Sequence, residues 1–496
     1  MFITDSYITT DGGSSTTPAG QVKLVCKSLI LVPPFLKHFG GPLAGPAYLK
    51  GAGERVGHKV DVLDLNQLWI EERINTIHKS GTIKGDHDKP SFELNRIFKE
   101  WQTLLAQHWP NKLNESDYDR KLVALYVTND EVINCAENLC NSDFGQYVLE
   151  SLSNLDRPDI VGLSVMFSGQ VIAALAITRL VKSRWPGVKV VWGGAHVTAL
   201  AERISKNSEY GMWVDGFVAG YAEQTWVDLL NSVATSKPWP TEVFAAGSKN
   251  IRAKEDPLTV PVFDITDKTK YDLTLPVQVS RGCAYGKCNF CTYPKIEGKY
   301  RKLNVQTIEP VIVKAQQLGA IVSFKDSLLV PGQLVEVADC INGRVKWSAC
   351  TKLHDSFDKA KMSDLASKGL STLEIGLETL DSNTQQLINK KQSTELFNAF
   401  LDAAEFSGIA VVINYMTGLP GADPDEEQKW YEYVKSEVAR RPKLKAKIEH
   451  NTFQLELLSE IGRNPKKYNI EIIAEWPWST LLEFKSINES KSRCLS

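Results

Sequence analysis

The sequence predicts an α/β protein made of an N-terminal doubly wound, Rossmann-like domain and a partial (β/α)6 barrel of the TIM type. Two observations support this prediction. Short apolar segments typical of buried parallel strands alternate with amphipathic helical segments in both halves of the chain. A connector rich in Pro and Lys, at about 236–272, separates the two series.

A long polar segment interrupts the first series. Strand, helix and strand patterns ("SLILVPPF", "GPAYLKGAGERVG", "KVDVLDL") fill 22–66 and predict a βαβ unit. Residues 67–155 are expected to form a helical insertion within a domain that spans 22–245. Strand patterns resume at "PDIVGLSVMFSG", "KVVWGGAH" and "VDGFVAG". Because such sheets bind ligands outside the carboxyl ends of their strands, the loops "FSGQ" and "GGAHVT" mark the expected binding edge.

The second series predicts the barrel, over 260–455. Six apolar segments recur, each followed by helical or irregular sequence: "LPVQVS", "AIVSFKDS", "VKWSACTK", "STLEIGLE", "AVVINYMTGLP" and "HNTFQLELL". A βα barrel places its chemistry at the ends of such strands. Residues 1–21 are expected to be a flexible N-terminal segment, and 456–496 an irregular, Trp-rich C-terminal extension with a polar tail.

Composition narrows the compartment and the partners. The formal net charge of -2 gives no basic surface for nucleic acid. No run of about eighteen apolar residues predicts a membrane span, and the polar start differs from a secretory signal. Nine cysteines, scattered except for one group, do not resemble a disulfide framework. We therefore expect a cytoplasmic protein whose partner is a small-molecule substrate, with no nucleic acid and no membrane.

The cysteine group lies in "SRGCAYGKCNFCTYPK", directly after the first barrel strand. Cys283, Cys288 and Cys291 have x4 and x2 spacing, and Gly282 and Gly286 let the loop curl without side-chain clashes. Three thiolates fit a zinc site completed by a distant ligand, or an iron–sulfur cubane with one iron left open. A structural zinc site usually shows a second ligand pair, and its absence favours the cubane. Free thiols are the remaining alternative.

The second half of the chain resembles the radical S-adenosylmethionine (SAM) superfamily. "SRGCAYGKCNFC" is similar to the cluster-binding motif, whose common form has three residues between the first two cysteines where this chain has four. "FKDSLL", "IGLET", "NYMTGLPGADPDEE" and "FQLELLSEIGRNPKKYNI" resemble later barrel segments, so the resemblance covers most of 270–475. It implies that Cys283, Cys288 and Cys291 hold a 4Fe-4S cluster, whose open iron takes the amino and carboxylate groups of SAM. Glu378 would contact SAM, and a barrel-end salt bridge is the equal alternative.

The first half resembles the cobalamin-binding domain that precedes the barrel in one branch of that superfamily. "GPLAGPAYLKGAGERVGHKVDVLDLN", "DIVGLSVMFSGQ", "VVWGGAHVT" and "VDGFVAGYAEQT" carry this resemblance, over about 25–70 and 155–235. The GxGxxG fingerprint of a dinucleotide-binding domain is absent after the first strand. Contacts with the nucleotide tail or the corrin amides are expected from small residues of two strand-end loops: Ser164, Ser168, Gly193 and Gly194.

Other polar residues have weaker claims to a role. The Asp-x-His-x-x-Gly motif, through which many cobalamin proteins supply a His to cobalt, is absent, and His38 and His58 lie outside any such motif. A loop histidine bonded to backbone explains His196 as well as a cofactor contact does. Ordinary strand-end polarity explains Asp326 and Lys352 better than a substrate contact does.

The joint resemblance implies a cobalamin-dependent radical SAM enzyme, expected to be a methyltransferase acting on an unactivated carbon or phosphorus centre of a small-molecule or natural-product intermediate. One SAM would methylate cob(I)alamin and a second would yield a 5'-deoxyadenosyl radical, after which the substrate radical takes methyl from methylcobalamin. The active site would lie between the two domains. An electron donor such as flavodoxin or ferredoxin would be a partner. The tail thiol of Cys494 is expected to be inert.

Three alternatives stay open. Within the same fold, the reaction would be non-methylating: a cyclisation, a rearrangement or 3-amino-3-carboxypropyl transfer from SAM. A non-catalytic cobalamin or iron–sulfur sensor would carry an output module such as a helix-turn-helix, and none is apparent. A zinc protein is the third. The sequence does not define the substrate.

Overall fold

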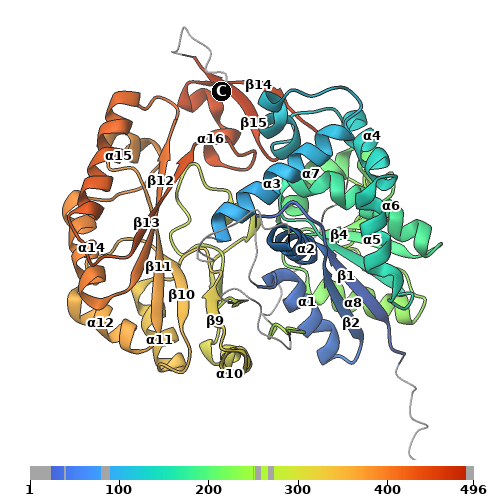
Figure 1. Ribbon diagram of the computed structural model, residues 1–496, viewed down its shortest axis with the longest axis horizontal. Coiled ribbons are helices and arrows are strands. Elements are labelled where there is room, and N and C mark those ends of the chain that lie inside the picture. The colour runs from blue at the N-terminus through green and yellow to red at the C-terminus, as the bar shows by residue number, and fades with distance from the viewer. Residues whose placement is uncertain are drawn as a thin grey trace, which may run out of the picture.

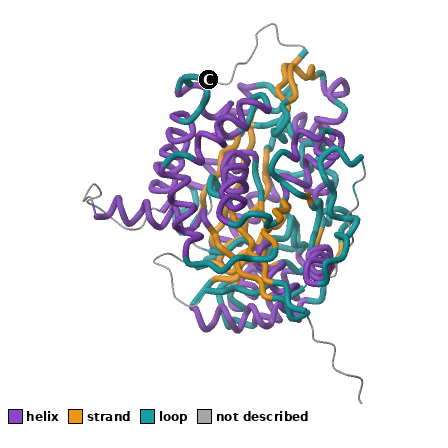
Figure 2. Tube along the Cα trace, turned by 90° about the vertical axis from the view of Figure 1, so that its right-hand side faces the viewer, coloured by secondary structure: helices purple, strands orange, loops and turns teal. Residues whose placement is uncertain are grey.

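Two α/β halves lie side by side in the computed structural model, the first blue to green and the second yellow to red (Figure 1). Seen from the side, helices flank the central strands (Figure 2). The expected flexible segment at 1–21 and Cys494 lie outside the described residues. The structure describes residues 24–37, 41–79, 90–249, 251, 259–265 and 273–487.

A five-stranded parallel sheet forms the N-terminal half, in the order β2-β1-β3-β4-β5. The chain moves from β1 to one neighbour and then crosses back past β1, so the strand order reverses between β1 and β3. Such a reversal opens a crevice at the carboxyl ends of those two strands, and this is where doubly wound sheets bind ligands. The strands are β1 (Lys27–Val32), β2 (Lys59–Asp64), β3 (Ile160–Ser164), β4 (Lys189–Gly193) and β5 (Gly216–Phe217).

Helices cover both faces of this sheet. On one face α6, with the sequence "VIAALAITRLVKSR", buries ten of its residues, because it lies between the sheet and further helices. On the other face α1 and α8 pack against each other, with Trp226 of α8 in the core between them and the sheet. The doubly wound prediction is confirmed. The helices are α1 (Ala44–Arg55), α6 (Val171–Arg184), α7 (Ala195–Lys206) and α8 (Glu223–Ala234).

The described residues between β2 and β3 form helices and loops. Their core is aromatic: Trp69 and Trp101 stack at 4.3 Å between ring centroids, and Phe144 meets both rings edge-on. Thr128 and Glu131 form a capping box that starts α4. Because α4 and α5 pack on α6, this layer shares the core of the N-terminal sheet. The main helices are α2 (Leu65–Lys79), α3 (Pro90–Gln107), α4 (Asn129–Cys140) and α5 (Asp143–Ser153).

Six parallel strands form the second sheet, in the order β13-β12-β11-β10-β9-β6. Each strand pairs with the next one along the chain, as in a partial βα barrel, and this prediction is confirmed. The last strand comes earlier than "HNTFQLELL" predicts, because Val411 of β12 pairs in register with Ala446. The strands are β6 (Thr274–Val277), β9 (Ile321–Phe324), β10 (Trp347–Thr351), β11 (Leu370–Glu378), β12 (Ala410–Thr417) and β13 (Ala446–Thr452).

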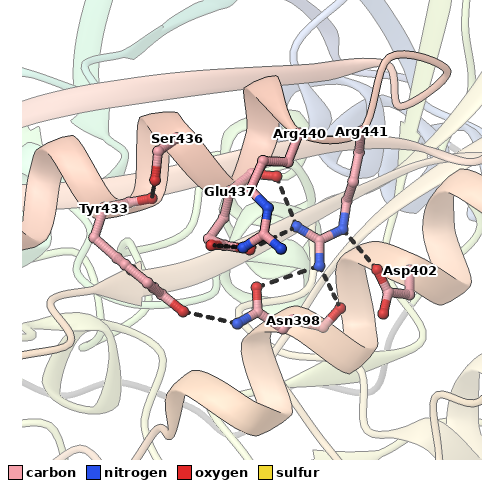
Figure 3. A network of polar contacts seen from close by, with 7 residues as sticks. All are labelled: Asn398, Asp402, Tyr433, Ser436, Glu437, Arg440 and Arg441. Atoms are coloured by element: carbon pink, nitrogen blue, oxygen red, sulfur yellow. Dashed lines mark hydrogen bonds and ion pairs between the residues drawn. The ribbon is translucent and has the colours of Figure 1, made fainter.

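Outer helices cover the barrel. Figure 3 shows Arg441, just after α15, bonded to Asp402 of α14 at 2.7 Å and to Glu437 of α15 at 3.1 Å. The same guanidinium reaches the side chain of Asn398 at 3.3 Å. This network joins α14 to the end of α15 and so places the start of β13. The outer helices are α10 (Glu309–Leu318), α11 (Pro331–Ile341), α12 (Lys359–Ser367), α13 (Ser382–Leu387), α14 (Thr394–Ser407) and α15 (Pro424–Ala439).

The region after β13 is more regular than its sequence predicts. After the short helix α16 (Glu460–Arg463), β14 (Ile470–Glu475) and β15 (Leu482–Ser486) form an antiparallel hairpin. Trp478, in the hairpin loop, belongs to the core of the N-terminal half and is 2% exposed. The expectation of irregular structure is therefore wrong for this hairpin, because the order comes from tertiary contacts that local patterns do not encode.

Glu456 lies where this hairpin meets the barrel, paired through a backbone bridge with Leu481. Burial raises the pKa of its carboxyl from the ordinary 4.5 to about 7. The folded protein then holds this proton to a higher pH than the unfolded chain does, so stability falls as pH rises through this window. We expect Glu456→Gln to match the wild type at about pH 4 and to exceed its free energy of unfolding by about 3 kcal/mol at about pH 8. Urea titrations at both pH values test this, and a pH-independent difference would contradict it.

Candidate functional site

The three motif cysteines lie on the loop between β7 (Ser280–Arg281) and α9 (Tyr293–Ile296). This loop leaves the carboxyl end of β6, the first barrel strand, as predicted. Cys283, Cys288 and Cys291 are each partly buried and unpaired. The loop is therefore placed where barrels carry their chemistry.

Two glycines give the loop its curvature. Gly282 and Gly286 have φ of 73° and 60°, in the left-handed region. The N–H of Gly286 donates to Sγ of Cys283 at 3.3 Å, which closes a turn over the four-residue gap. Within that gap the Tyr285 hydroxyl donates to the carbonyl of Asn389 at 2.6 Å. The longer spacing therefore provides an anchor to the segment after α13.

A buried ion pair lies at the carboxyl end of β11, a central strand of the barrel sheet. Glu378 has φ of 63°, and its Oε1 accepts from Nζ of Lys390 at 2.9 Å. Gly376 makes room for this contact, because a Cβ there would stand 2.6 Å from Oε1 of Glu378. Lys390 also lowers the pKa of Cys288, against the larger effect of burial, which raises it. Of the two expectations for Glu378, the structure contains the salt bridge, and it lies beside the cysteine loop.

Asp326 and Lys352 support the cysteine loop. The carboxylate of Asp326 accepts from the N–H groups of Val279 and Ser280 at 3.1 and 2.5 Å, and from the Ser280 hydroxyl at 2.6 Å. Burial raises the pKa of Asp326 to about 7, and these hydrogen bonds oppose that shift. Nζ of Lys352 lies 4.0 Å from the ring centroid of Tyr285. Both side chains thus hold the loop.

The predicted small residues of the N-terminal half gather at the carboxyl edge of its sheet. Ser164 ends β3, and a Cβ added to Gly45 in the first turn of α1 would stand 3.9 Å from its Oγ. Gly193 ends β4, and Gly194 has φ of 108°. Ser168 follows on the loop after β3. Ser164 and Ser168 therefore border the crevice between β1 and β3, and Gly193 and Gly194 lie at the end of the adjacent strand β4.

His196 lies in the first turn of α7 at this edge, 2% exposed. Both of its ring nitrogens are buried and lack a hydrogen-bond partner among the described residues. Burial lowers the pKa of the imidazole to about 3, so the ring is neutral. The structure thus contradicts the alternative of a side chain bonded to backbone.

His58 has a structural role. Its Nδ1 accepts from the N–H of Cys26 at 3.2 Å, and its Nε2 lies 3.1 Å from Oδ1 of Asn231. It precedes β2 and so lies at the amino end of the sheet, away from the crevice. His38 falls outside the described residues.

The two edges face each other. Helix α7, which follows the Gly-Gly loop, contacts α9, which follows Cys291. The Tyr48 hydroxyl on α1 accepts from the N–H of Gln278 at 2.9 Å. The crevice of the N-terminal sheet and the cysteine loop of the barrel therefore meet at one interface.

Comparison with protein families assigns both halves. A model of the B12 binding domain matches residues 118–230, and a model of the Radical SAM superfamily matches residues 277–434. The chain thus carries a B12-binding domain followed by a radical SAM domain. The B12 match begins within the helices that precede β3 and leaves β1 and β2 unmatched, although they complete the same sheet.

Solved structures share this two-domain architecture. The radical SAM methyltransferase TsrM from Kitasatospora setae, with cobalamin and a [4Fe-4S] cluster bound, is 13% identical with a TM-score of 0.56, over 93% of this chain and 83% of that one. The cobalamin-dependent radical SAM enzyme OxsB, with aqua-cobalamin bound, is 12% identical with a TM-score of 0.59, over 93% of this chain and 65% of OxsB. At such identities the similarity shows the fold. No curated protein sequence matches the chain.

The cysteine loop of the radical SAM barrel fits a cluster better than a single ion. Zinc needs its ligands about 2.0–2.3 Å from one centre, and no three Cys, His, Asp or Glu side chains within the described ranges could hold one ion. A cubane takes one thiolate per iron, so its ligand sulfurs stand further apart. Burial, with smaller contributions from Cys288 and Cys283, raises the pKa of Cys291 to about 12, so the three thiols are electrostatic neighbours.

The crevice of the cobalamin-binding domain fits a large ligand rich in amides. The two unpartnered nitrogens of His196 can accept from and donate to an amide, and leaving them buried without a partner costs free energy. Gly194 lets backbone approach closely, since a Cβ there would stand 2.3 Å from the carbonyl oxygen of Val165. The unpartnered imidazole favours a bound group at this edge.

The interior of the radical SAM barrel is polar. Side chains alternate between the two faces of β11. Ile375 and Leu377 point away from the barrel axis into the hydrophobic core between strands and outer helices, whereas Glu374 points toward the barrel interior and is exposed to solvent. The side chain of Asn414 donates to Glu374 at 2.7 Å. Cys350, which pairs in register with Glu374, faces the same side. These inward residues escaped the sequence analysis, although the alternation along "STLEIGLE" could have identified Glu374.

Three further charged residues were missed. Lys390, the partner of Glu378, lies just beyond α13 and has no pattern around it. Arg281 and Glu223 form a buried ion pair between the two domains. Their positions beside strand ends, in "SRGC" and "GYAE", gave no sign that the two residues pair. Among the described residues, no helix is long and apolar enough to cross a membrane.

Gly194→Ala should damage the cobalamin-binding edge. The new methyl group would meet the Val165 carbonyl oxygen at 2.3 Å, and alanine is strained at φ of 108°. We expect about 2 kcal/mol or more of lost stability and at least about tenfold weaker cobalamin binding. Gly332→Ala in α11 is the control, because nothing lies within 4 Å of its added Cβ. Urea unfolding and cobalamin titration measure both effects; equal behaviour of the two variants would contradict the assignment of this edge.

Proposed function

We propose that this protein is a cobalamin-dependent radical SAM methyltransferase that acts on an unactivated carbon or phosphorus centre of a polar small molecule or natural-product intermediate. The proposal rests on one observation above all: α7, at the crevice of the cobalamin-binding domain, contacts α9, which follows the cysteine loop of the barrel. With both groups bound, SAM at the cluster supplies a 5'-deoxyadenosyl radical and cobalamin supplies a methyl group.

The loop contains both the proposed cluster ligands and the residues that hold the loop in place. Cys283, Cys288 and Cys291 hold the 4Fe-4S cluster, and the N–H of Gly286 stabilises the Cys283 thiolate through its hydrogen bond. Tyr285, bonded to the carbonyl of Asn389, keeps the loop in place against the barrel. Ligands on a loop held in this way would hold the cluster firmly, and the cluster would supply the electron that cleaves SAM.

At the end of β11, Glu378 contacts SAM. Its Oε1 accepts from Lys390, and Oε2 is the oxygen we assign to the cofactor. The ion pair compensates the charge of this carboxylate in a buried place. Its left-handed φ fixes the direction of the side chain at the strand end.

The inward face of the barrel selects a polar substrate. Glu374 and Asn414 are bonded to each other, and Ser348 meets Ser323 at 3.3 Å. These groups offer acceptors and donors to the substrate side of the interface. One structure of TsrM is described with tryptophan as substrate and a SAM analog, at 14% identity and a TM-score of 0.56, over 90% of this chain and 79% of that one. A small polar metabolite suits the interior of this chain, and flavodoxin or ferredoxin would deliver electrons.

A non-methylating reaction is the second candidate: cyclisation, rearrangement or 3-amino-3-carboxypropyl transfer. It stays open because the similarity to TsrM and OxsB, at 13% and 12% identity, shows the fold and does not define the reaction.

Labelled SAM separates the two candidates. The loaded enzyme, a reductant and SAM with a CD3 group would be incubated with fractionated small metabolites, and products analysed by mass spectrometry. Methyl transfer predicts a product that gains CD3 together with S-adenosylhomocysteine and 5'-deoxyadenosine. A product formed without the label, alongside 5'-deoxyadenosine, would overturn it in favour of the non-methylating reaction.

A further inference from the structure

Arg281 is a fully buried arginine two residues before the first cluster cysteine, with an exposed fraction of 1%. Its guanidinium Nη2 donates to Oε1 of Glu223, which is 4% exposed and is the first residue of α8 in the cobalamin-binding domain. This ion pair therefore links the start of the cluster loop to the other domain. A carboxylate at the N-terminus of α8 also gains from the helix dipole.

The surroundings of the pair come mainly from the cobalamin-binding domain. The Arg281 guanidinium lies 3.7 Å from the ring centroid of Tyr221, in the loop before α8, and 5.9 Å from that of Tyr48 on α1. Cation–π contacts of this kind are strongest when desolvated. Arg281 is thus enclosed by residues of the opposite domain.

This pair is poorly built for stability alone. Nε and Nη1 of Arg281 and Oε2 of Glu223 are buried and have no hydrogen-bond partner within the described part of the chain. Burying two charges costs more than their attraction returns unless their remaining groups are satisfied, and apolar residues of similar volume often serve as well. What such a pair does provide is a fixed geometry, because the charges tolerate one arrangement only.

The backbone on both sides of Arg281 is also held. Ser280 is bonded to Asp326 through its N–H and its hydroxyl. The N–H of Gly282 donates to Oε2 of Glu297 at 3.0 Å. An added Cβ at Gly282 would stand 2.8 Å from backbone atoms of residues 298–300, so the backbone here is tightly packed and cannot shift freely. A shift of Arg281 is therefore transmitted to Cys283.

We propose that Arg281 and Glu223 are a positioning pair, which sets the distance and orientation between the cluster site and the cobalamin site. The inference rests on the proposed function for its purpose, because methyl transfer requires substrate, adenosyl carbon and cobalt to be aligned. The pair itself touches no reacting atom. It acts through the cluster loop on one side and through α8 on the other.

Pulsed dipolar electron paramagnetic resonance tests this in the full-length, doubly loaded protein. The reduced cluster and cob(II)alamin are both paramagnetic, so their coupling reports the distance between them. The wild type should give one narrow distance distribution. Glu223→Gln, which keeps the shape of the side chain, and Arg281→Lys, which keeps the charge, should each broaden or shift it while both cofactors stay bound. A matched control is Glu309→Gln, which weakens an exposed pair with Arg344, bonded at 2.5 and 2.7 Å on the outer surface of the barrel.

The distance distributions and cofactor contents of the variants distinguish a positioning role from a binding role. A distance distribution unchanged from wild type in both variants would overturn the proposal, and so would loss of either cofactor from Glu223→Gln, which would indicate a binding role instead. A broadened distribution with a melting curve close to that of the Glu309→Gln control supports it. Under turnover, the ratio of 5'-deoxyadenosine to final product should rise about tenfold in Glu223→Gln. Because the distance measurement needs no substrate, it tests the pair even where methyl transfer fails.

Discussion

Cys288→Ala is expected to prevent assembly of the 4Fe-4S cluster and to lower 5'-deoxyadenosine formation by about a thousandfold or more. The loop carries three free thiols beside two left-handed glycines, and in the proposed site each thiolate would be the protein's ligand to a different iron. With one ligand missing, the loop would no longer hold the cluster that supplies the electron for SAM cleavage. Iron and sulfide analysis after anaerobic reconstitution, with chromatography of 5'-deoxyadenosine, measures both effects.

Cys350→Ala is the matched control, because this thiol is also free and partly buried in the same barrel. It lies on β10, in register with Glu374, and burial raises its pKa to about 12. We expect this variant to keep its full iron content and 5'-deoxyadenosine formation within about twofold of wild type. Retention of the cluster in Cys288→Ala, or its loss in Cys350→Ala, would contradict the assignment of the ligands.

Trp478→Ala should cost about 3–5 kcal/mol of stability, the typical range for a buried Trp replaced by Ala. The side chain is 2% exposed and lies in the core of the cobalamin-binding domain. Its ring centroid lies 4.5 Å from that of Tyr210 and 6.0 Å from that of Trp192. Its Nε1 donates to Oδ1 of Asn129 at 2.8 Å. Removing it leaves a cavity and an unpaired amide, and it detaches the C-terminal hairpin from that core. Urea unfolding followed by circular dichroism measures the loss.

Ile473→Ala provides the comparison from the same hairpin. Ile473 lies on β14 and is 56% exposed, so its loss should change the free energy of unfolding by no more than about 0.5 kcal/mol. Equal effects of the two substitutions would show that the hairpin does not anchor in the N-terminal core.

The alternation of apolar strands with helices was enough to predict both sheets, because parallel strands buried on both faces read as apolar runs. "SLILVPPF" and "STLEIGLE" became β1 and β11 of the two sheets. Even β5, with only two paired residues, was recognisable from the small residues after it in "VDGFVAG".

The C-terminal hairpin shows where local pattern fails. Strands β14 and β15 pair only with each other, and their loop is fixed by Arg203, which donates to the carbonyls of Trp476 and Ser479 at 2.7 and 3.0 Å. These contacts join residues more than 270 positions apart. Tryptophans in "AEWPWST" gave no indication of which core would receive them.

The candidate site divides in the same way. The cysteine loop was predictable because its spacing and its glycines are local. The interdomain pair of Arg281 and Glu223 was not, since a buried charge shows its partner only in three dimensions. Likewise, nothing local connects Glu378 to Lys390, which reaches it from a separate turn. Long-range partners of charged residues are the part of the site that needs a structure.

The central claim is that cluster, SAM and cobalamin work across one interface to move a methyl group. It is tested most directly by loading the protein with cob(I)alamin, adding SAM that carries CD3, and extracting the cobalamin for mass spectrometry. This needs no knowledge of the substrate. The account predicts CD3 on the extracted cobalamin, with S-adenosylhomocysteine formed in equal amount. Unlabelled cobalamin from a protein that still cleaves SAM to 5'-deoxyadenosine would contradict it.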